Sequence, residues 1–311
     1  MRNKADLIIY LAVAFGGAWL AAIPLWIQPQ GLQSTALPLS LAGLQLSPTL
    51  GVLVVWLVTA LRKDPAARQW ARQTGLTFGP RPGRTVAYLA ATWAGIPVLI
   101  AGVIAISALF GVFPTDLAGL SGYRQAFPQG THATAAVGTL AGIVVSTLLA
   151  SVTAFGEEWG WRGFMLPRLL PLGYGRAILA SGIIWGLWHA PLTLLGWNYP
   201  GLGPWAALPF TVFCVAAGAG LGWLRLRTGS VWPAVIGHGV LNAAVPTLYL
   251  VVSAAGRLPD PLLGGVFGAV GLLVFGVLGL ALARVRPPDD AMPSSHASAS
   301  SSPSISSSQA T

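Results

Sequence analysis

The sequence predicts an all-α, polytopic integral membrane protein with about eight transmembrane helices. Of its 311 residues, 54% are hydrophobic and only 8% are charged, and the mean hydropathy is +0.70. A soluble domain of this length would carry about a quarter charged residues. The deficit of charge therefore indicates a chain that folds in a bilayer rather than in water.

The first half of the chain holds four apolar runs that could cross a bilayer, since a span needs roughly 20 predominantly apolar residues. These runs cover residues 7–27, 38–61, 86–112 and 134–160. The first run is longer than the apolar core of a signal peptide, so we expect an uncleaved helix there. The second is interrupted by Ser47-Pro48, and without it the count would fall to seven.

The second half adds four more predicted spans and a tail of different composition. The spans cover residues 176–196, 205–224, 230–251 and 262–283. Residues 1–284 are therefore expected to form one transmembrane helical domain. The segment 285–311 is rich in serine and proline and has little to bury, so we expect it to be disordered.

Basic residues are distributed unevenly among the segments between the predicted spans. If the N-terminus is cytoplasmic, fifteen of the 17 basic residues fall in cytoplasmic segments and only Arg124 and Arg257 fall outside. The fifteen are Arg2, Lys4, Arg62, Lys63, Arg68, Arg72, Arg81, Arg84, Arg162, Arg168, Arg176, Arg225, Arg227, Arg284 and Arg286. The positive-inside rule therefore places both termini in the cytoplasm. The formal charge of +9 reflects topology and membrane lipid, not nucleic-acid binding.

The composition also bears on the source of the chain and on the cytoplasmic loop 62–85. A chain rich in alanine, glycine and arginine with few lysines indicates a GC-rich bacterial source, and hence the bacterial cytoplasmic membrane. Trp70, flanked by Arg68 and Arg72, could lie in an interfacial helix on anionic lipid. An ordinary cytoplasmic loop that follows the charge bias explains the same residues.

A small set of polar side chains interrupts the predicted spans. Ionisable groups in this position are costly and mark functional sites by default. The set comprises Glu157, Glu158 and Arg162 on the fourth span, His189 on the fifth, and His238 with Asn242 on the seventh. Glu157 and Glu158 are the only glutamates in the chain, whereas His132 lies at the outer border of a span and is treated as interfacial.

The spacing of these residues predicts which of them share a helix face. Glu158 and Arg162 are four residues apart, so they can form an ion pair on one face. Glu157 lies about 100° around the helix from Glu158 and therefore stays available for other partners. His238 and Asn242 are also four residues apart and present two hydrogen-bond donors from one face.

Depth along the helices allows one shared site. Glu157, His189 and His238 lie roughly 9 to 14 residues, or about 13–21 Å, from the predicted cytoplasmic ends of their helices. Similar depths permit one cavity that opens to the cytoplasm. A carboxylate, two imidazoles and an amide in such a cavity suffice for amide hydrolysis, with water activated by Glu157 and His189. His238 and Asn242 would donate hydrogen bonds to the oxyanion.

Three short motifs resemble those of one family. "EEWGWR" at 157–162 fits EExxxR, "WGLWH" at 185–189 fits FxxxH with Trp185 in place of the usual phenylalanine, and "HGVLN" at 238–242 fits HxxxN. Together, in this order, they resemble the CAAX protease and bacteriocin-processing (CPBP, or Abi) family of intramembrane endopeptidases. The resemblance covers about residues 130–250, the expected catalytic core.

The resemblance implies an eight-helix membrane fold with a site reached from the cytoplasm. It implies that Glu157 and His189 activate water, that Glu158 and Arg162 support the site, and that His238 and Asn242 form the oxyanion hole. It also implies a peptide or membrane-protein substrate. That substrate would be lipidated if it carried a prenylated cysteine. Because such prenylation is not expected in bacteria, an unlipidated bacterial peptide is an equal candidate.

Several alternatives stay open at this stage. Glu157, His189 and His238 could form a zinc site with water as the fourth ligand, although the sequence lacks HExxH and we expect a cofactor-free glutamate mechanism. A proton-coupled transporter could use the same acids and histidines, and a non-catalytic scaffold or immunity protein would use them as helix–helix contacts. "GLSG" at 119–122 resembles a serine-protease motif, but a turn explains Ser121 better, and the lone Cys214 is expected to be a core residue.

Overall fold

The chain folds as a bundle of helices in a computed structural model that describes residues 2–285. The predicted tail 285–311 lies outside the described residues except for Val285. The long helices are α1 (Arg2–Ile27), α2 (Leu37–Leu61), α4 (Pro82–Leu109), α6 (His132–Glu158), α10 (Ala207–Thr228) and α11 (Trp232–Val252). The shorter ones are α3 (Trp70–Gln73), α5 (Ser121–Ala126), α7 (Leu166–Leu169), α8 (Tyr174–Trp188), α9 (Ala190–Thr193) and α12 (Ala269–Arg284). No strand is present in this part of the chain, apart from one isolated bridge between Thr115 and Ser253.

An all-helical structure follows from the apolar composition. Within hydrocarbon each backbone amide and carbonyl must be paired inside its own segment, which a helix achieves. Large apolar side chains face outward along most of α6, among them Val137, Leu148 and Val152, which are 69%, 65% and 71% exposed. An outward face of this kind is suited to lipid rather than to water.

The number of membrane-spanning helices differs from the prediction of about eight. Among the described residues, six helices are long and apolar enough to cross a membrane. They are Lys4–Ile27, Leu37–Leu61, Pro82–Leu109, the helix within His132–Leu172, Gly203–Thr228 and Trp232–Val252. Pro48 lies inside α2 without breaking it, so the second predicted span is one continuous helix.

The two remaining predicted spans form helices that are shorter than expected. The run 176–196 forms α8, which has 15 residues and ends at Trp188. Pro191 follows closely, and a proline cannot donate the amide hydrogen that a continuing helix requires. The run 262–283 forms α12, which has 16 residues because Gly265, with φ +69, and the residues around it form a turn before Ala269.

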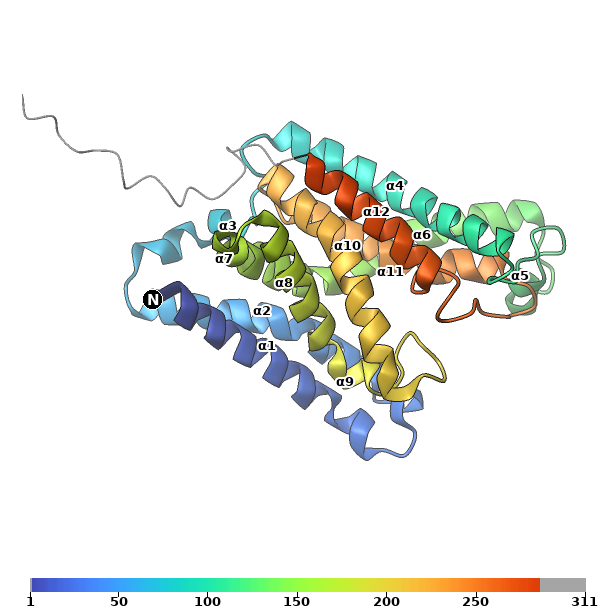
Figure 1. Ribbon diagram of the computed structural model, residues 1–311, viewed down its shortest axis with the longest axis horizontal. Helices are drawn as coiled ribbons and strands as arrows, with labels where there is room; N and C mark the ends of the chain where they lie inside the picture. The colour runs from blue at the N-terminus through green and yellow to red at the C-terminus, as the bar shows by residue number, and fades with distance from the viewer. Residues whose placement is uncertain (1, 286–311) are drawn as a thin grey trace, which may run out of the picture.

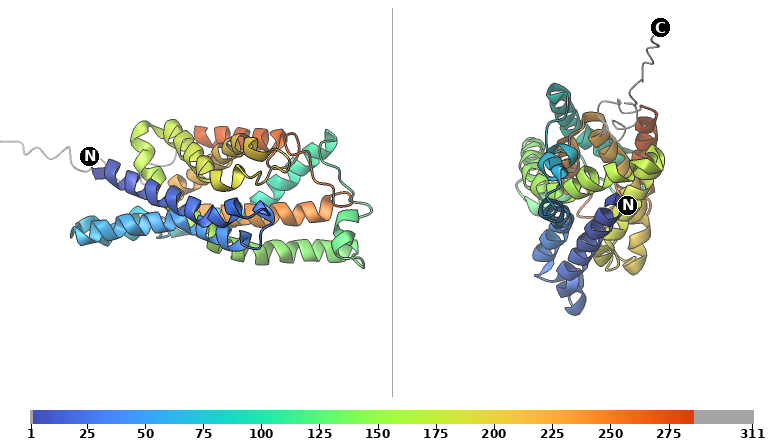
Figure 2. Two further views of the ribbon diagram at one scale, coloured as in Figure 1. Left: turned by 90° about the horizontal axis from the view of Figure 1, so that it is seen from below. Right: turned by 90° about the vertical axis from the view of Figure 1, so that its left-hand side faces the viewer.

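The helices pack in a consistent arrangement (Figure 1). α1 lies against α2, α6 against α11, and α8 against α10, while α11 also contacts α4 and α10 also contacts α12. Two further views show the same elongated bundle, with α1 and α2 forming one side of it (Figure 2). The start of α1, the end of α2 and the end of α12 lie at one end of the bundle, and α5 lies at the other.

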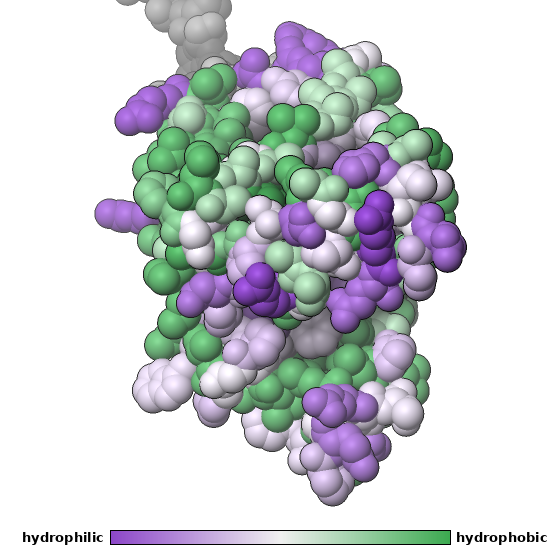
Figure 3. Space-filling model, turned by 90° about the vertical axis from the view of Figure 1, so that its right-hand side faces the viewer, coloured by the Kyte–Doolittle hydropathy of each residue, from purple (hydrophilic) through white to green (hydrophobic). Residues whose placement is uncertain are grey.

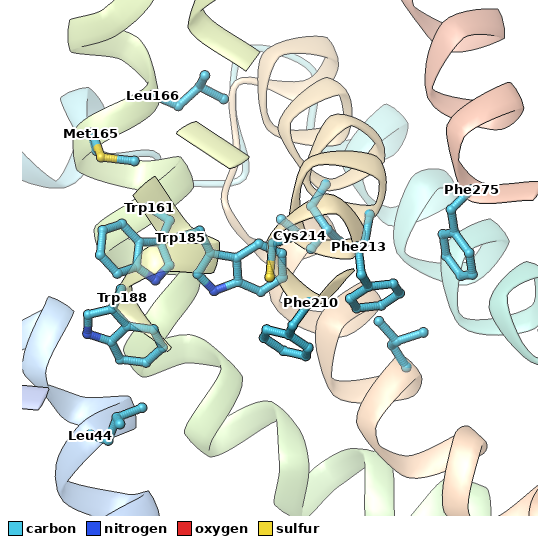
Figure 4. Close-up of a cluster of buried hydrophobic side chains, with 14 of the residues drawn as sticks. Leu44, Trp161, Met165, Leu166, Trp185, Trp188, Phe210, Phe213, Cys214 and Phe275 are labelled. Carbon is cyan, nitrogen blue, oxygen red and sulfur yellow. The ribbon is translucent and has the colours of Figure 1, made fainter. Parts of the chain in front are cut away.

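An aromatic core fills the space between α2, α8, α10 and the segment that follows α6 (Figure 4). Trp161, Trp188 and Phe210 lie in this core close to Trp185 and Cys214. The ring centroids of Trp161 and Trp188 are 5.4 Å apart in an edge-to-face arrangement. Cys214 is fully buried there, in agreement with its predicted place in the core.

Glycines on α8 allow it to approach α10 closely. A Cβ atom added at Gly182 would lie 2.6 Å from the Cα atom of Val215, and one added at Gly186 would lie 2.6 Å from that of Thr211. Backbone atoms cannot move aside as a flexible side chain can, so this spacing requires glycine. His189 follows Gly186 by less than one helical turn, and its position therefore depends on this contact.

We predict that Gly186→Ala lowers the thermal stability of the protein in detergent. Overpacking of this kind costs about 1–3 kcal/mol, which exceeds the gain of about 1 kcal/mol from alanine in a helix. Gly175→Ala on the same helix is the matched control, because nothing lies within 4 Å of its added methyl group. Equal melting temperatures for the two variants would contradict the proposed close contact between α8 and α10.

Candidate active site

The motif "EEWGWR" straddles a change in helix geometry. α6 ends at Glu158 and the chain continues as a π-helix over Trp159–Met165 before α7 begins. π-Helical turns are rare and occur mostly at functional sites. The sequence analysis placed Glu157, Glu158 and Arg162 on one span and did not predict this change. The π-helix still leaves Arg162 on the same side as Glu158, so the predicted ion pair forms.

Glycines in and beside the π-helix allow neighbouring segments to come very close. An added Cβ at Gly156 would lie 2.6 Å from the carbonyl oxygen of Gln45, and one at Gly160 would lie 2.5 Å from a side-chain carbon of Pro48. The hydroxyl group of Thr49 donates to the carbonyl oxygen of Gly156 over 2.9 Å. The motif is therefore held firmly against α2.

Glu158 forms the centre of a buried charged group. Its Oε1 atom accepts a hydrogen bond from Arg162 Nη1 at 2.7 Å and lies 2.9 Å from His238 Nδ1. All three side chains are buried. An ionised carboxylate only accepts hydrogen bonds, so Nδ1 of His238 carries the proton in this contact. The pairing of Glu158 with Arg162 was predicted, whereas its contact with His238, which links α6 to α11, was not.

Glu157 has a separate set of partners. Its Oε2 atom accepts a hydrogen bond from Trp185 Nε1 at 2.8 Å and lies 4.0 Å from His189 Nε2. The side chain is 2% exposed, and it points toward the histidine of α8 rather than toward lipid. The two adjacent glutamates therefore diverge as the helical spacing predicted, one to the ion pair and one to His189.

His189 is oriented by a contact within its own helix turn. Its Nδ1 atom lies 2.9 Å from the carbonyl oxygen of Trp185. A carbonyl oxygen can only accept, so Nδ1 carries a hydrogen and Nε2 is the atom that faces Glu157. The rings of Trp185, Trp188 and Phe210 lie around the imidazole in edge-to-face geometry and keep it in this orientation.

Trp185 is the site residue whose role the sequence analysis missed. The sequence analysis noted only that tryptophan stands in place of the usual phenylalanine and gave this residue no role. In the structure the indole N–H binds Glu157, and the ring face lies 4.1 Å from the guanidinium carbon of Arg162. Trp185 therefore contacts both halves of the polar site. The extra N–H donor of tryptophan, four residues from a predicted site histidine, was the signal available.

A large cavity joins the predicted site residues. It has a volume of about 1160 Å³ and is lined by Glu157, His189, His238 and Asn242. Asn242 is exposed to this space, one helical turn from His238 on α11. All six predicted site residues are thus brought together, Glu158 and Arg162 in the buried layer behind the four that reach the cavity.

The cavity opens at the end of the bundle opposite to the predicted one. Besides side chains of α8, α10 and α11, its lining includes the first turns of α2, α5, and residues of the segments 197–200 and 253–264. Each of these lies at the end of the molecule that the charge distribution predicts to be outside the cytoplasm. The predicted cavity open to the basic end is therefore wrong, because helices of similar depth can be reached from either side.

The described residues bear on the zinc alternative as well. No group of three or more histidine, cysteine, aspartate or glutamate side chains in residues 2–285 is arranged to hold a metal ion. One nitrogen of each site histidine is occupied, by the Trp185 carbonyl for His189 and by Glu158 for His238. Metal-binding histidines commonly have such a partner on their second nitrogen, so Nε2 of each histidine is the atom left for a water molecule or a metal ion.

Three other predicted positions have structural roles in the described residues. Ser121 accepts a hydrogen bond from the backbone amide of Ala255 over 2.8 Å, as expected of a turn residue. A ring nitrogen of the exposed His132 lies 3.1 Å from the carbonyl oxygen of Leu117. Trp70 is buried and packs against Phe164, with ring centroids 5.8 Å apart, so it does not face lipid as the interfacial alternative required.

Comparison with family models relates the part of the chain that holds this polar centre to the CAAX-type proteases. Residues 139–244 match the family "Type II CAAX prenyl endopeptidase Rce1-like". The matched range covers about a third of the chain and contains all six predicted site residues, so this part of the chain is similar to the CAAX proteases. No curated protein matches the chain significantly.

We predict that Trp185→Phe lowers the rate of peptide cleavage by about tenfold or more. A hydrogen bond to a charged group contributes about 1.5–3 kcal/mol, and each 1.36 kcal/mol of barrier is about tenfold in rate. Phenylalanine keeps the aromatic face under Arg162 but cannot donate to Glu157.

The matched control is Trp223→Phe, which removes an indole donor that binds the carbonyl oxygen of Val285, far from the polar site. Both variants should be purified and compared by cleavage rate and melting temperature. If Trp185→Phe cleaves as fast as Trp223→Phe, the indole hydrogen bond does not position Glu157 for the reaction.

Proposed function

We propose that this protein is an intramembrane endopeptidase in which Glu157 and His189 activate a water molecule and His238 and Asn242 stabilise the oxyanion. The observation that supports this proposal best is the convergence of all four side chains on one cavity. The family supports a protease. The assignment of roles below is derived from the hydrogen bonds of the site.

The distance between Glu157 and His189 suits a shared water molecule. Glu157 Oε2 and His189 Nε2 are 4.0 Å apart, so one water oxygen placed beside them can be within about 2.8 Å of each atom. Glu157 then removes one proton as the water oxygen attacks the carbonyl carbon of the peptide bond. His189 holds the water, because its other nitrogen is already fixed by the Trp185 carbonyl.

The next steps place negative charge on the former carbonyl oxygen and then break the C–N bond. His238 Nδ1 is held by Glu158, so its Nε2 atom is the one directed to substrate. Nε2 donates to the oxyanion when the ring is an imidazolium, a charge that the carboxylate of Glu158 supports. The amide group of Asn242 donates from the next turn. Glu157 passes its proton to the departing amine, which leaves a carboxylic acid and an amine as products.

The shape of the cavity indicates the kind of substrate. Apart from Glu157, His189 and His238, its lining contains no acidic, lysine or arginine side chain. A volume of about 1160 Å³ is above the range of about 300–1,000 Å³ for small-molecule pockets. We propose a membrane-associated peptide or protein substrate with uncharged residues around the cleaved bond, and its lipidation is left to experiment.

We predict that Glu157→Gln abolishes cleavage of a pool of quenched fluorescent peptides while the melting temperature stays close to that of the parent. Glutamine has the same size and can still accept from Trp185, but it cannot remove a proton from water. General acid–base groups contribute about 10²- to 10⁴-fold in rate.

Dialysis against a chelator before the same assay separates the glutamate mechanism from the zinc alternative. We expect cleavage to survive chelation. Loss of cleavage that added zinc restores would overturn the metal-free mechanism, and full activity of Glu157→Gln would overturn the role of Glu157 and favour a non-catalytic scaffold.

We further predict that Asn242→Ala lowers kcat by about 10²- to 10³-fold, the usual effect of removing one oxyanion donor. Because the donor acts in the transition state, KM should change little. Gln125→Ala is the matched control, since Gln125 lines the same cavity from α5. A change confined to KM for Asn242→Ala would place that amide in substrate binding instead.

A further inference from the structure

A second cavity lies between α4, α10, α11 and α12 and has a volume of about 370 Å³. Figure 1 shows α4 and α12 side by side along the bundle. Ala91 and Gly95, which line this cavity on α4, are exposed, so it is open to the surface, and we call it the α4–α12 groove.

The groove is distinct from the cavity of the candidate site. That cavity opens at the end of the bundle seen in Figure 3, where hydrophilic residues surround a recess. Among the described residues, Leu241 is the only one that lines both spaces. Leu241 directly precedes Asn242 on α11, so an occupant of the groove would touch the helix that carries His238 and Asn242.

The lining of the groove is almost entirely apolar. Apart from Thr92 and Trp223, the lining residues are glycines or residues with hydrocarbon side chains. A buried water molecule needs two to four polar partners, and an empty space of this size loses dispersion contacts on every wall. An apolar cavity of about 150 Å³ already holds a benzene molecule. The groove therefore suits a hydrocarbon chain.

Two glycines in the lining leave space that no other part of the protein fills. A Cβ atom added at Gly95 on α4 or at Gly220 on α10 would have nothing within 4 Å. Glycines at helix contacts usually allow two backbones to approach closely, as Gly182 does between α8 and α10. Gly95 and Gly220 make no such contact, so their small size serves the groove and not helix packing.

The groove is elongated and follows the helix axes. On α4 its lining extends from Ala91 to Leu99, a rise of about 12 Å. On α12 it extends from Phe275 to Leu282. Because α4 begins at the end of the bundle where α10 and α12 end, Ala91 and Leu282 mark one end of the groove, and Leu99 and Phe275 mark the other.

Aromatic and basic side chains surround the first of these ends. Trp223 lines it, donates through Nε1 to the carbonyl oxygen of Val285 at 2.9 Å, and contacts the ring of Tyr88, with centroids 5.6 Å apart. The Nε atom of Arg227 donates to the hydroxyl group of Tyr88 at 3.3 Å. Tryptophan and tyrosine are enriched at the level of lipid headgroups, so this end of the groove has the composition of a membrane interface.

Positive charge gathers at the same end from three helices. Arg84 precedes Tyr88 by one turn on α4, Arg227 lies in the last turn of α10, and Arg284 is the last residue of α12. Arg284 is exposed, and the other two are partly exposed. No acidic residue occurs on α4, α10 or α12. Basic pockets between membrane helices bind anionic headgroups, and the guanidinium group matches the geometry of a phosphate.

We infer that the α4–α12 groove is a binding site for an anionic phospholipid. One acyl chain lies in the groove beside Gly95 and Gly220, and the phosphate lies at its basic end, near Arg84 and Arg284. This inference goes beyond the proposed function, because neither the site nor its test involves peptide cleavage.

Filling the groove tests the site of the acyl chain. Dioleoyl-phosphatidylglycerol is titrated into the detergent-purified protein, and bound lipid is counted by native mass spectrometry. Gly95→Leu places a side chain in the groove. The matched control is Gly102→Leu, because Gly102 is also exposed on α4, has nothing within 4 Å and does not line the groove. We expect Gly95→Leu to weaken binding by at least about tenfold, the effect of losing about two buried methylene groups, and Gly102→Leu to bind like the parent.

A second pair of variants keeps the test decisive if Gly95→Leu does not fold. Gly220→Leu fills the groove from α10, and Gly276→Leu on α12 is its control, since nothing lies within 4 Å of Gly276 and it is outside the lining. Parent-like binding in a folded Gly95→Leu or Gly220→Leu protein would overturn the inference, as would equal weakening in the controls. A lipid-free dimer that Gly95→Leu dissociates would instead assign the groove to a second copy of the chain.

The charge of the headgroup is tested separately with two lipids of identical acyl chains. We expect the parent to bind phosphatidylglycerol more tightly than the zwitterionic phosphatidylcholine. Arg84→Gln combined with Arg284→Gln should remove this preference and leave chain binding in place. Arg72→Gln is the control, because Arg72 is exposed in the loop between α2 and α4, away from the groove. Equal binding of the two lipids by the parent would overturn the assignment to an anionic phospholipid.

Discussion

The carboxylate of Glu158 accepts from Arg162 at 2.7 Å and lies 2.9 Å from Nδ1 of His238, and the rest of the site is arranged around these two contacts. Each of the three groups is buried in a bundle whose surroundings are apolar. An unpaired charge in such a place costs several kcal/mol, and removal of one partner leaves the others uncompensated. α6 and α11 are therefore fixed in depth relative to each other, because any sliding would separate the charges.

The same constraint determines how the reactive groups face the cavity. Glu158 binds Nδ1 of His238, so Nε2 of His238 is directed to the cavity. The carbonyl oxygen of Trp185 binds Nδ1 of His189, so Nε2 of His189 is directed to the cavity as well. Arg162 stacks on the ring of Trp185, whose N–H in turn binds Glu157. The two glutamates are thereby connected through one indole, and α8 is joined to the contact between α6 and α11.

Sequence reasoning predicted the groups along each helix better than the contacts between helices. The i, i+4 spacing was sufficient for Glu158 with Arg162. Hydropathy located the six helices long enough to span a membrane, whereas α8 and α12 are shorter than the spans predicted there. The contact of Glu158 with His238 depends on how two distant helices pack, which spacing within one helix does not determine. The π-helix after Glu158 depends on close packing at glycines, and the early end of α8 depends on Pro191. Neither effect can be inferred from the length of an apolar run. The side on which the cavity opens depends on the loops, whose positions have no periodic signal.

Water is a reactant in peptide hydrolysis, and hydrocarbon does not supply it. The structure meets this requirement with a cavity that runs from a mouth bearing Gln125, Asn198 and Ser253 down to Glu157 and the two histidines. Between these polar ends the walls include Phe210, Phe213 and Leu241, which favour apolar side chains of a bound peptide. The loop between α2 and α4 is hydrogen-bonded across the other end of the bundle, and the polar mouth gives water a route to Glu157. Access to the mouth therefore controls the supply of water to Glu157 as well as the choice of peptide.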